Sequence, residues 1–302
     1  MVCTLQILTT DECIKEGILS KEKLTALSKQ IIPDLYKKSK GEVGRIGVLG
    51  GSDEFSGAPY FGALTSLRET AAPIIKGYSP DLIVYPYLSK HYASKISRIL
   101  EKLDVVVVGP GFGREVEQIA LIQDIIETCK SLKKPLVVDA DGLYALSTNV
   151  SVLLNYPKPG AILTPNRREA AKLIEAINSN NTHWYNYWGG NVSVLVKGYE
   201  DTFYTSVNKF NWSLLGGGSD RRTAGQGDIL AGAMGTFYNW ALKANLCDNE
   251  NSLQVAQSVA AYAASKFTRT CNAHAFAENG RNMIASDMLH KIHSSFEELF
   301  GV

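Results

Sequence analysis

The sequence predicts an α/β fold, in which a central, mostly parallel sheet carries helices on both faces. Short runs rich in valine, isoleucine and leucine alternate with longer segments whose apolar residues recur at helical spacing. The short runs are apolar throughout, as is typical of parallel strands buried on both faces. With 302 residues, of which 45% are hydrophobic, the chain can build the core of one such domain.

The chain divides into an N-terminal helical extension, residues 1–40, and one domain, residues 41–302. Apolar residues between 19 and 36 recur at helical spacing before a basic stretch at 37–40. After residue 40 we find no internal repeat and no low-complexity linker. We therefore predict one or two helices before residue 40 and a single domain after it.

The predicted strands and helices alternate through most of this domain. The strand candidates are the β-branched runs at 45–51, 81–85, 104–108, 135–139, 161–164 and 192–197. The helix candidates are the segments at 58–68, 71–76, 116–132, 168–177, 229–244 and 255–270. This order predicts parallel strands that are joined by helices.

Polar or glycine-rich turns follow successive strands, at 109–114, 139–143, 164–169 and 197–201. Ligands of such sheets bind beyond the carboxyl ends of the strands, so these turns predict one pocket along that edge. Each turn also has a purely structural interpretation. The glycines of 109–113 suit a tight turn, and Asp139 and Asp141 suit turns or helix caps. Their joint position on one edge favours the pocket.

The last two turns carry further side chains with two interpretations. Asn166 with Glu169 three residues later is a capping-box pattern, and the same side chains suit a substrate or a hydrated metal ion. Lys197 is either a solvated surface lysine or, at the end of a buried strand, a ligand for phosphate.

The segment TAGQGDILAG, residues 223–232, predicts the start of a helix with an anion site. Gly225 and Gly227 allow a tight turn and a close approach of the backbone to a ligand. The unpaired N–H groups of the first helical turn attract an anion such as phosphate. Asp228 beside that anion can take a proton from an attacking hydroxyl. The alternative is that Asp228 is simply the N-cap.

Composition and missing motifs exclude several function classes. A net charge of +1 gives no electrostatic reason to bind nucleic acid or an anionic membrane, and no apolar run is long enough to span a bilayer. Neither a Walker A loop nor a G-x-G-x-x-G dinucleotide turn occurs, and the cysteines and histidines lack zinc-ligand spacing. The N-terminal residues resemble neither a secretory signal nor a typical transit peptide, so we expect a cytoplasmic protein and leave a mitochondrial form open.

Taken together and in order, these segments resemble the eukaryotic ATP-dependent NAD(P)H-hydrate dehydratases, a family with a ribokinase-like fold. The resemblance runs from about residue 41 to the C-terminus. It is carried by the segments GRIGVLGGSDEFSGAPYFGA, KGYSPDLIVYPYL, VVVVGPGFGR, PLVVDADGL, ILTPNRREAAKL, VLVKGYED, GSDRRTAGQGDILAG and NGRNMIASDML.

The resemblance implies a nucleotide repair reaction. The S-epimer of hydrated NADH or NADPH (NADHX or NADPHX) is phosphorylated on its new hydroxyl by ATP and then loses phosphate. Asp228 is implied as the catalytic base, and Gly225 and Gly227 as part of the anion hole. The hydrate-binding residues implied are Gly113, Asn166, Arg167, Arg168, Glu169, Ala170, Ala171, Lys172 and Asp228. The ATP-binding residues implied are Lys197, Gly198, Tyr199, Glu200, Asp201, Gly218, Ser219, Asp220, Arg221, Arg222, Thr223, Ala224, Gly225, Gln226 and Gly227.

The expected cofactor is Mg²⁺, because ATP phosphates need a cation during transfer, although the sequence does not identify its ligands. The family also implies a functional partnership with an epimerase that acts on the same hydrates, and a homo-oligomer is possible.

The chain departs from the family pattern in two places. Family members carry a further strand between the helices that we predict at 58–68 and 71–76, whereas only Glu69 and Thr70 stand there. We therefore predict that the sheet lacks one strand near residues 68–71, which leaves apolar surface and backbone groups uncovered. The second departure is Thr223-Ala224, where the family usually ends the pair with glycine.

Two alternatives to the dehydratase remain open from the sequence. One is a ribokinase-like kinase of a vitamin-type hydroxymethyl compound, because G-x-G-D alone does not separate the two activities. The other is a non-catalytic nucleotide-binding form, which the missing strand makes plausible.

Overall fold

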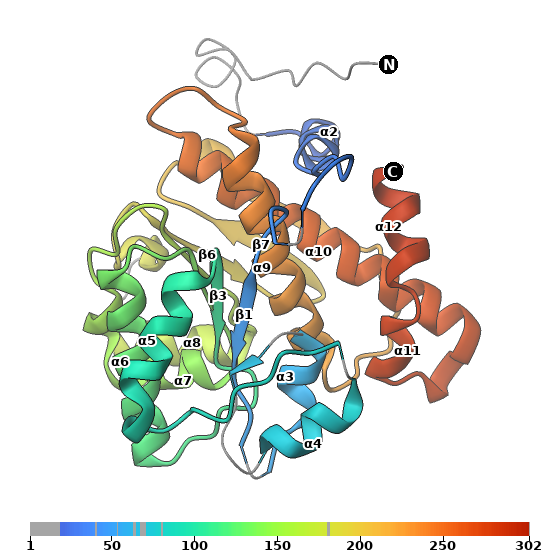
Figure 1. Ribbon diagram of the computed structural model, residues 1–302. Coiled ribbons are helices and arrows are strands. Elements are labelled where there is room, and N and C mark those ends of the chain that lie inside the picture. Colours follow the sequence, from blue (N-terminus) through green and yellow to red (C-terminus); the bar gives the residue numbers. More distant parts are fainter. Residues whose placement is uncertain are drawn as a thin grey trace.

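A computed structural model describes residues 19–39, 41–52, 54–62, 65–66, 71–79, 81–179 and 182–301. One eight-stranded sheet, in the order β2-β1-β3-β4-β5-β6-β7-β8, runs through the middle of the molecule, and helices lie on both sides of it (Figure 1). The predicted α/β class is confirmed.

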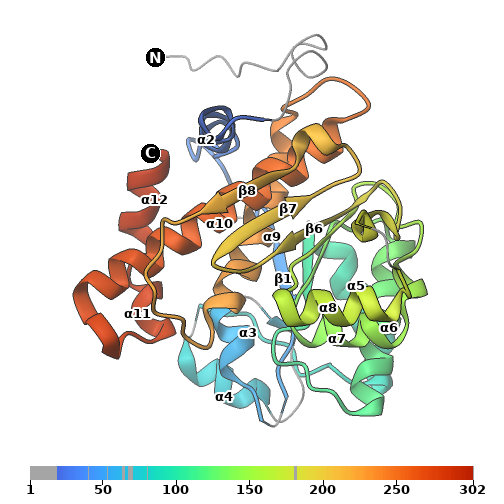
Figure 2. The same ribbon diagram turned by 180° about the vertical axis from the view of Figure 1, so that it is seen from behind.

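Six neighbouring strands of the sheet are parallel, and two antiparallel strands extend it at one edge. The mostly parallel sheet predicted from the β-branched runs is therefore confirmed. The strands are β1 (Ile46–Leu49), β2 (Thr65–Ser66), β3 (Val105–Val108), β4 (Leu136–Val138), β5 (Ala161–Leu163), β6 (Val192–Val196), β7 (Glu200–Tyr204) and β8 (Trp212–Leu215). Figure 2 shows β6, β7 and β8 from behind, and all three strands contact α10.

The helices that connect and cover these strands are α2 (Lys21–Gln30), α3 (Gly57–Gly62), α4 (Ala71–Tyr78), α5 (Ala93–Lys102), α6 (Val116–Ser131), α7 (Asp141–Thr148), α8 (Arg167–Ala176), α9 (Gln226–Ala244), α10 (Ser252–Asn279), α11 (Ala285–Leu289) and α12 (Ile292–Phe300). Within the described part of the chain, no helix combines the length and apolar character that spanning a bilayer requires.

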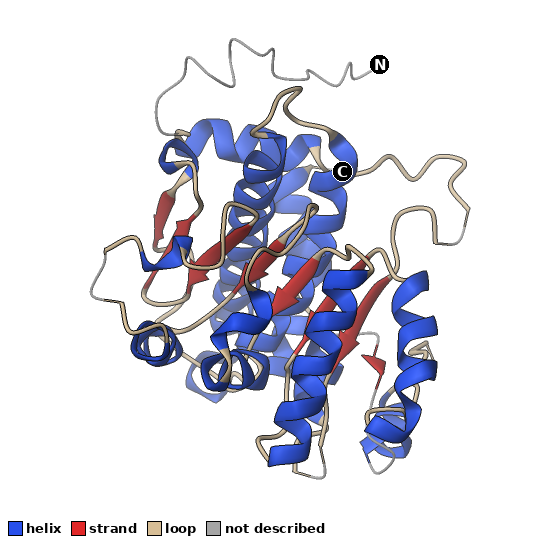
Figure 3. Cartoon of the chain, turned by 90° about the vertical axis from the view of Figure 1, so that its left-hand side faces the viewer, coloured by secondary structure: helices blue, strands red, loops and turns tan. Residues whose placement is uncertain are grey.

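The strands have apolar side chains on both faces because each face packs on a separate layer of helices (Figure 3). Val105 and Val107 of β3 belong to the core cluster that includes α9 and α10. Val106 and Val108 belong to the cluster on the other face, with α5 to α8. Successive side chains of a strand point to opposite faces, which explains why this strand reads as an unbroken valine run.

The N-terminal helix α2 is part of the packed molecule. Leu24 and Leu27 are buried, and Thr25 Oγ1 lies 3.2 Å from the hydroxyl oxygen of Tyr262 on α10. A helix reaching residue 36 is wrong, because α2 ends at Gln30, and the side chains from residue 34 to 39 are exposed. Of the one or two helices predicted within residues 1–40, α2 is present, and residues 1–18 lie outside the described residues. The extension at 1–40 as a separate unit stays a prediction.

The region beside β1 differs most from the sequence prediction. The helix predicted at 58–68 ends at Gly62, and Thr65–Ser66 forms the short strand β2 opposite Val48 and Leu49. The strand predicted at 81–85 is wrong: within it only Tyr85 makes a β-bridge, and Val84 packs in a small cluster with Ile75. Residues 67–70, where we predict that the family strand is missing, lie outside the described residues, and that statement stays a prediction.

Besides β2, two strands of the sheet escaped the sequence analysis. β7 and β8 form a hairpin-like pair that follows β6, and β7 includes Glu200 and Asp201, which the sequence analysis placed in a turn. Their residues alternate between buried and more exposed, so they lack the continuous apolar run that marks the parallel strands.

Candidate functional site

The carboxyl ends of β4, β5 and β6 bring three polar side chains into contact. Lys197 Nζ donates to Asp139 Oδ1 at 2.5 Å, and Thr164 Oγ1 donates to the same oxygen at 2.9 Å. Asp139 is 1% exposed, so its charge is withdrawn from water and needs these partners. The interpretation of Lys197 as a solvated surface lysine is therefore wrong. Asp139 is neither a simple turn residue nor a cap, because its carboxylate holds this lysine.

Asp228 lies in the first turn of α9, at the third helical position. The N-cap of α9 is Gly225, with φ of +91°. The simple N-cap alternative for Asp228 is therefore wrong. Only glycine fits at 225, because a Cβ there would lie 2.8 Å from that of Ala285. Ala224 has no left-handed φ, so this departure from the family pattern adds no backbone strain.

The carboxylates near Lys197 share one electrostatic environment. Burial, followed by the charge of Asp139, raises the pKa of Asp228 to about 7, although the nearby Lys197 acts to lower it. Burial by itself lowers the pKa of Lys197, but Asp139, Glu169 and Asp228 outweigh it, so that pKa lies above its ordinary value. The lysine therefore stays charged, while Asp228 titrates near neutral pH.

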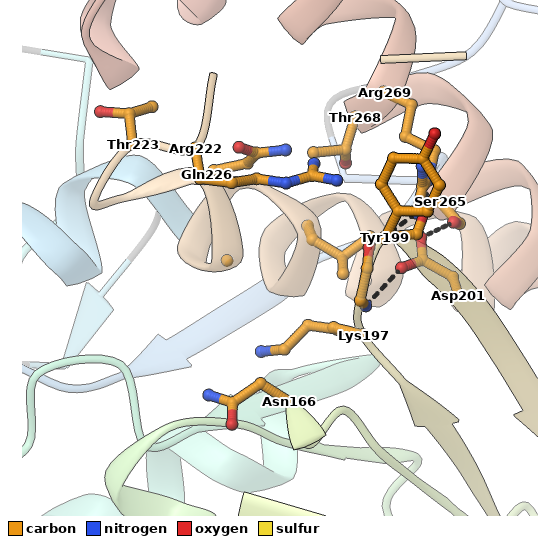
Figure 4. A pocket seen from close by; sticks show the side chains of 13 residues that line it. Asn166, Lys197, Tyr199, Asp201, Arg222, Thr223, Gln226, Ser265, Thr268 and Arg269 are labelled. Atoms are coloured by element: carbon orange, nitrogen blue, oxygen red, sulfur yellow. Dashed lines mark hydrogen bonds and ion pairs between the residues drawn. The ribbon is translucent and has the colours of Figure 1, made fainter. Parts of the chain in front are cut away.

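A cleft of about 460 Å³ opens beside this cluster, between the β6–β7 turn, the N-terminus of α9 and the side of α10. In Figure 4, Lys197 and Asn166 lie on one side of it, opposite Gln226 and Arg222. The lining residues are Asn166, Lys197, Gly198, Tyr199, Asp201, Arg222, Thr223, Gln226, Gly227, Leu230, Ser265, Thr268 and Arg269. Its size lies within the range usual for small-molecule sites.

A second, smaller pocket of about 270 Å³ lies on the other side of Asn166. Its walls carry positive charge around an aromatic ring: the guanidinium of Arg114 lies 4.8 Å, and the ammonium of Lys172 5.4 Å, from the ring centroid of Tyr144. The lining residues are Arg114, Ala140, Leu143, Tyr144, Ser147, Asn166, Arg168, Glu169 and Lys172. Because Asn166 lines both cavities, the two pockets share a wall.

That shared wall is fixed by the capping box that the sequence predicted. Asn166 Oδ1 accepts from the backbone N–H groups of Arg168 at 2.9 Å and Glu169 at 3.0 Å. Glu169 Oε2 accepts from the backbone N–H of Asn166 at 2.7 Å. The structural interpretation of the pair is therefore correct. It does not exclude ligand contacts, because both residues line pockets as well.

Asp141 holds the 109–114 loop over the smaller pocket. Its Oδ2 accepts from the backbone N–H of Gly113 at 2.9 Å, and its Oδ1 accepts from Arg114 Nε at 2.7 Å. The loop also needs glycine where backbones meet, since a Cβ at Gly109 would lie 1.9 Å from the carbonyl oxygen of Asp139. The GPGFGR turn is thus a tight turn, and its last residue, Arg114, lines the pocket.

The structure brings part of each predicted set to the pockets. Of the hydrate-binding prediction, Asn166, Arg168, Glu169 and Lys172 line the smaller pocket, whereas Gly113, Arg167, Ala170 and Ala171 do not. Of the ATP-binding prediction, the residues that line the larger cleft are Lys197, Gly198, Tyr199, Asp201, Arg222, Thr223, Gln226 and Gly227. The residues that do not are Glu200, Gly218, Ser219, Asp220, Arg221, Ala224 and Gly225. Asp228 lines neither cavity and follows directly on Gly227.

Sequence reasoning missed the contribution of α10 to the larger cleft. Ser265, Thr268 and Arg269 line it, and all three are buried. Their spacing of three and four residues places them on one face of the helix. Polar residues at helical spacing inside a long buried helix are the signal that would have found them. Arg114 and Tyr144 of the smaller pocket were likewise not assigned from the sequence.

Comparisons with known proteins agree over nearly the whole chain. A family model described as NAD(P)H-hydrate dehydratase matches residues 46–294. Among curated proteins named ATP-dependent (S)-NAD(P)H-hydrate dehydratase, that of Aedes aegypti is 40% identical over 294 residues, 93% of this chain and 86% of its own. That of Drosophila melanogaster is 41% identical (92% and 94% covered), and that of Homo sapiens 37% identical (94% and 86% covered).

Solved structures show the same fold at low identity. A hypothetical protein from Streptococcus mutans superposes with a TM-score of 0.73 at 18% identity, covering 94% of this chain and all of its own. A ribokinase-like superfamily protein from Enterococcus faecalis gives a TM-score of 0.72 at 16% identity, covering 91% and 94%. The fold is therefore ribokinase-like.

Proposed function

Because this chain belongs to the NAD(P)H-hydrate dehydratase family, we propose that its two pockets carry out the ATP-dependent dehydration of the S-epimer of hydrated NADH or NADPH. The chain is thus an enzyme, as its relatives are named to be. ATP occupies the cleft of about 460 Å³, and the hydrated ring of the dinucleotide enters from the smaller pocket.

The observation that carries this proposal is the position and pKa of Asp228. It stands at the N-terminus of α9, next to Gly227 on the wall of the ATP cleft, and Asp139, Lys197 and Asp141 are near enough for their charges to act on it. A general base works best when its pKa lies near the working pH, and that of Asp228 is about 7. The carboxylate accepts the proton of the hydrate's hydroxyl as its oxygen attacks the terminal phosphorus of ATP.

The remaining residues stabilise charge and hold the reactants. Lys197 keeps its proton and lies close to Gly227, where a Cβ would be 3.5 Å from its Nζ. A fixed ammonium beside the unpaired N–H groups of α9 stabilises the negative charge of the transferring phosphoryl group. Phosphorylation turns a hydroxyl into a good leaving group, and the ring nitrogen's electron pair then expels phosphate. Positioning and charge therefore suffice, without a covalent enzyme intermediate.

We propose Mg²⁺ as the cofactor that accompanies ATP. The donor chemistry fits, because Glu169, on the wall of the adjoining pocket, carries a carboxylate near Lys197, and Mg²⁺ favours such oxygens together with phosphate. The described residues include no cluster of three ligating side chains, so most of the coordination would come from phosphate and water. When bound, the ion offsets phosphate charge.

Three further expectations remain proposals. A dehydratase that uses the S-epimer benefits from an epimerase that converts the R form, which makes that enzyme a functional partner. A homo-oligomer and a cytoplasmic location are the remaining expectations from the sequence.

The test is turnover of purified S-NADHX or S-NADPHX with ATP and Mg²⁺, followed by the returning absorbance of the dihydropyridine. We expect one ADP and one phosphate for each dinucleotide restored. Hydroxyethylthiazole and hydroxymethylpyrimidine serve as competing substrates. Consumption of ATP with a vitamin alcohol and none with either hydrate would assign the kinase activity instead. Binding of nucleotide without turnover of any of them would assign the non-catalytic alternative.

A further inference from the structure

Arg269 of α10 sits in the wall of the ATP cleft, where an arginine would ordinarily be taken for a phosphate ligand. Its side chain instead forms hydrogen bonds to other groups of the protein. Nε donates to Asp201 Oδ2 at 2.9 Å, and Nη1 donates to the carbonyl of Gly216 at 3.0 Å. Nη2 donates to the carbonyls of Gly198 at 3.0 Å and Tyr199 at 3.1 Å. Of the five N–H donors of a guanidinium, these bonds use all but one.

Asp201 is used just as fully. Its Oδ1 accepts from the backbone N–H of Gly198 at 2.9 Å, and its Oδ2 accepts from Arg269 and from the hydroxyl of Ser265. Asp201 is 5% and Arg269 4% exposed. A buried carboxylate that already accepts these bonds has little capacity left for a ligand, and Figure 4 shows its side chain turned toward Ser265 and Arg269.

The carbonyls that Arg269 holds belong to two segments that lie on either side of β7 and β8 in the sequence. Gly198 and Tyr199 form the turn between β6 and β7, whereas Gly216 begins the loop that runs from β8 to α9. Both segments line or lead into the ATP cleft. One planar guanidinium therefore fixes the distance between the two sides of the cleft.

One turn further along α10, a second buried side chain also forms hydrogen bonds to the loop between β8 and α9. Asn272 Oδ1 accepts from the backbone N–H of Ser219 at 2.6 Å, and its Nδ2 donates to the carbonyl of Arg221 at 3.0 Å. Asn272 is fully buried. The loop from residue 216 to α9 is thus hydrogen-bonded to α10 at two points, through Arg269 and through Asn272. It leads into the first turn of α9, which contains Gln226 and Asp228.

We infer that Arg269 is a positioning residue for ATP: with Asp201 it sets the spacing of the two nucleotide-binding segments and does not itself contact phosphate. This inference rests on the proposed function for the identity of the nucleotide. Lys197 and Arg222 are the other cations that line the cleft, and in this proposal they bind the phosphates. Asp201, predicted from the sequence to bind ATP, acts through Arg269.

The test replaces Arg269 by lysine, which keeps the charge next to Asp201 but cannot reach all three carbonyls. We expect the KM for ATP and the Kd for ADP, measured by calorimetric titration, to rise at least tenfold. The KM for the hydrate should stay within twofold of wild type, and kcat should fall less than the affinity for ATP. Arg281→Lys, an exposed residue after α10, is the matched control and should change none of these values.

A purely structural role would lower the melting temperature and the active fraction while leaving both KM values and the Kd for ADP unchanged, and that result overturns the inference. If Arg269→Lys does not fold, Ser265→Ala tests the same network, because it removes only the hydroxyl bond to Asp201. We expect it to weaken ADP binding about threefold, and an unchanged Kd also overturns the inference. The ADP titration needs no turnover, so a failure of the proposed function remains distinguishable.

Discussion

Strands β3 to β6 each have a paired neighbour on both sides, whereas β1 is paired along its outer edge, among the described residues, by the two residues of β2. The side chains that form the site follow β4, β5 and β6 and are held by hydrogen bonds to one another. Beside β1, by contrast, Ile83 is 55% and Ile74 51% exposed. The candidate site therefore lies at the ends of strands that are paired on both sides.

The comparison teaches that the site takes its partners from the supported strands and not from the edge beside β1. Asp139, Lys197 and Asp228 obtain their partners from β4 to β6 and α9. One link between the two regions is α3, which packs on α9: a Cβ at Gly232 would lie 2.4 Å from the carbonyl oxygen of Gly62. A change that displaces α3 would therefore press on α9, the helix that carries Asp228.

The largest expected effect is the loss of catalysis in Asp228→Asn. The amide keeps the shape of the carboxyl but accepts no proton, so kcat should fall about 10³-fold, as is usual when a general base is removed. Steady-state assays with S-NADHX and ATP measure it. Asp124→Asn, on the exposed face of α6, is the control. A kcat within threefold of wild type would show that another group accepts the proton.

The next effect concerns the stability of the site. Lys197→Met leaves the buried Asp139 without its cation, which should lower the free energy of unfolding by about 3 kcal/mol. Urea denaturation at pH 7 measures it. The matched control is Lys243→Met, because Lys243 lies 3.9 Å from Asp104 in an exposed ion pair and should cost less than about 1 kcal/mol. Equal losses of unfolding free energy in the two variants would show that the buried ion pair contributes no more to stability than the exposed one.

Core substitutions compare the supported sheet with the edge directly. Val107→Ala, at a fully buried position of β3, should cost about 2.5 kcal/mol through lost burial and a cavity. Val84→Ala removes the same atoms from the small cluster with Ala72 and Ile75 and should cost about 1 kcal/mol, because the partly buried neighbours of so small a cluster can shift toward the vacated space. Urea midpoints of the two variants give the answer. A larger loss for Val84→Ala would show that the edge is as tightly packed as the centre.

The smallest effect is the pH dependence that Asp228 contributes. Since the pKa of its carboxyl is about 7 and the ionised form is the base, kcat/KM should fall as the pH drops below about 7. The effect on stability has the opposite sign. A pKa raised from 3.8 stabilises the fold most below about pH 4, and this contribution is lost as the pH rises through 7.

Wild type should therefore lose on the order of 1 kcal/mol between pH 5 and pH 8 that Asp228→Asn does not lose, a discounted value because the side chain is partly exposed. Melting curves of both proteins at the two pH values measure the difference. Parallel curves would mean that the pKa of Asp228 is close to its ordinary value.

The sequence by itself determined the strands at the centre of the sheet, because a strand buried on both faces must be apolar at every position, and valine runs record that directly. It also determined that the polar turns would meet, since the carboxyl ends of parallel strands lie at one edge. The capping box at Asn166 could be predicted for the same kind of reason, as its partners are three residues apart.

Only the tertiary structure decided which carboxylate meets which cation. The pairs Lys197 with Asp139 and Arg269 with Asp201 join residues more than fifty positions apart. The residues that surround each of them in the sequence do not indicate which partner it will meet. β7, β8 and the strand wrongly predicted at 81–85 show the same limit for backbone structure. A segment forms a strand only where the backbone of a neighbouring segment pairs with it. The pattern of apolar residues shows which faces of a strand are buried, but it does not show whether the backbone groups along its edges have a partner.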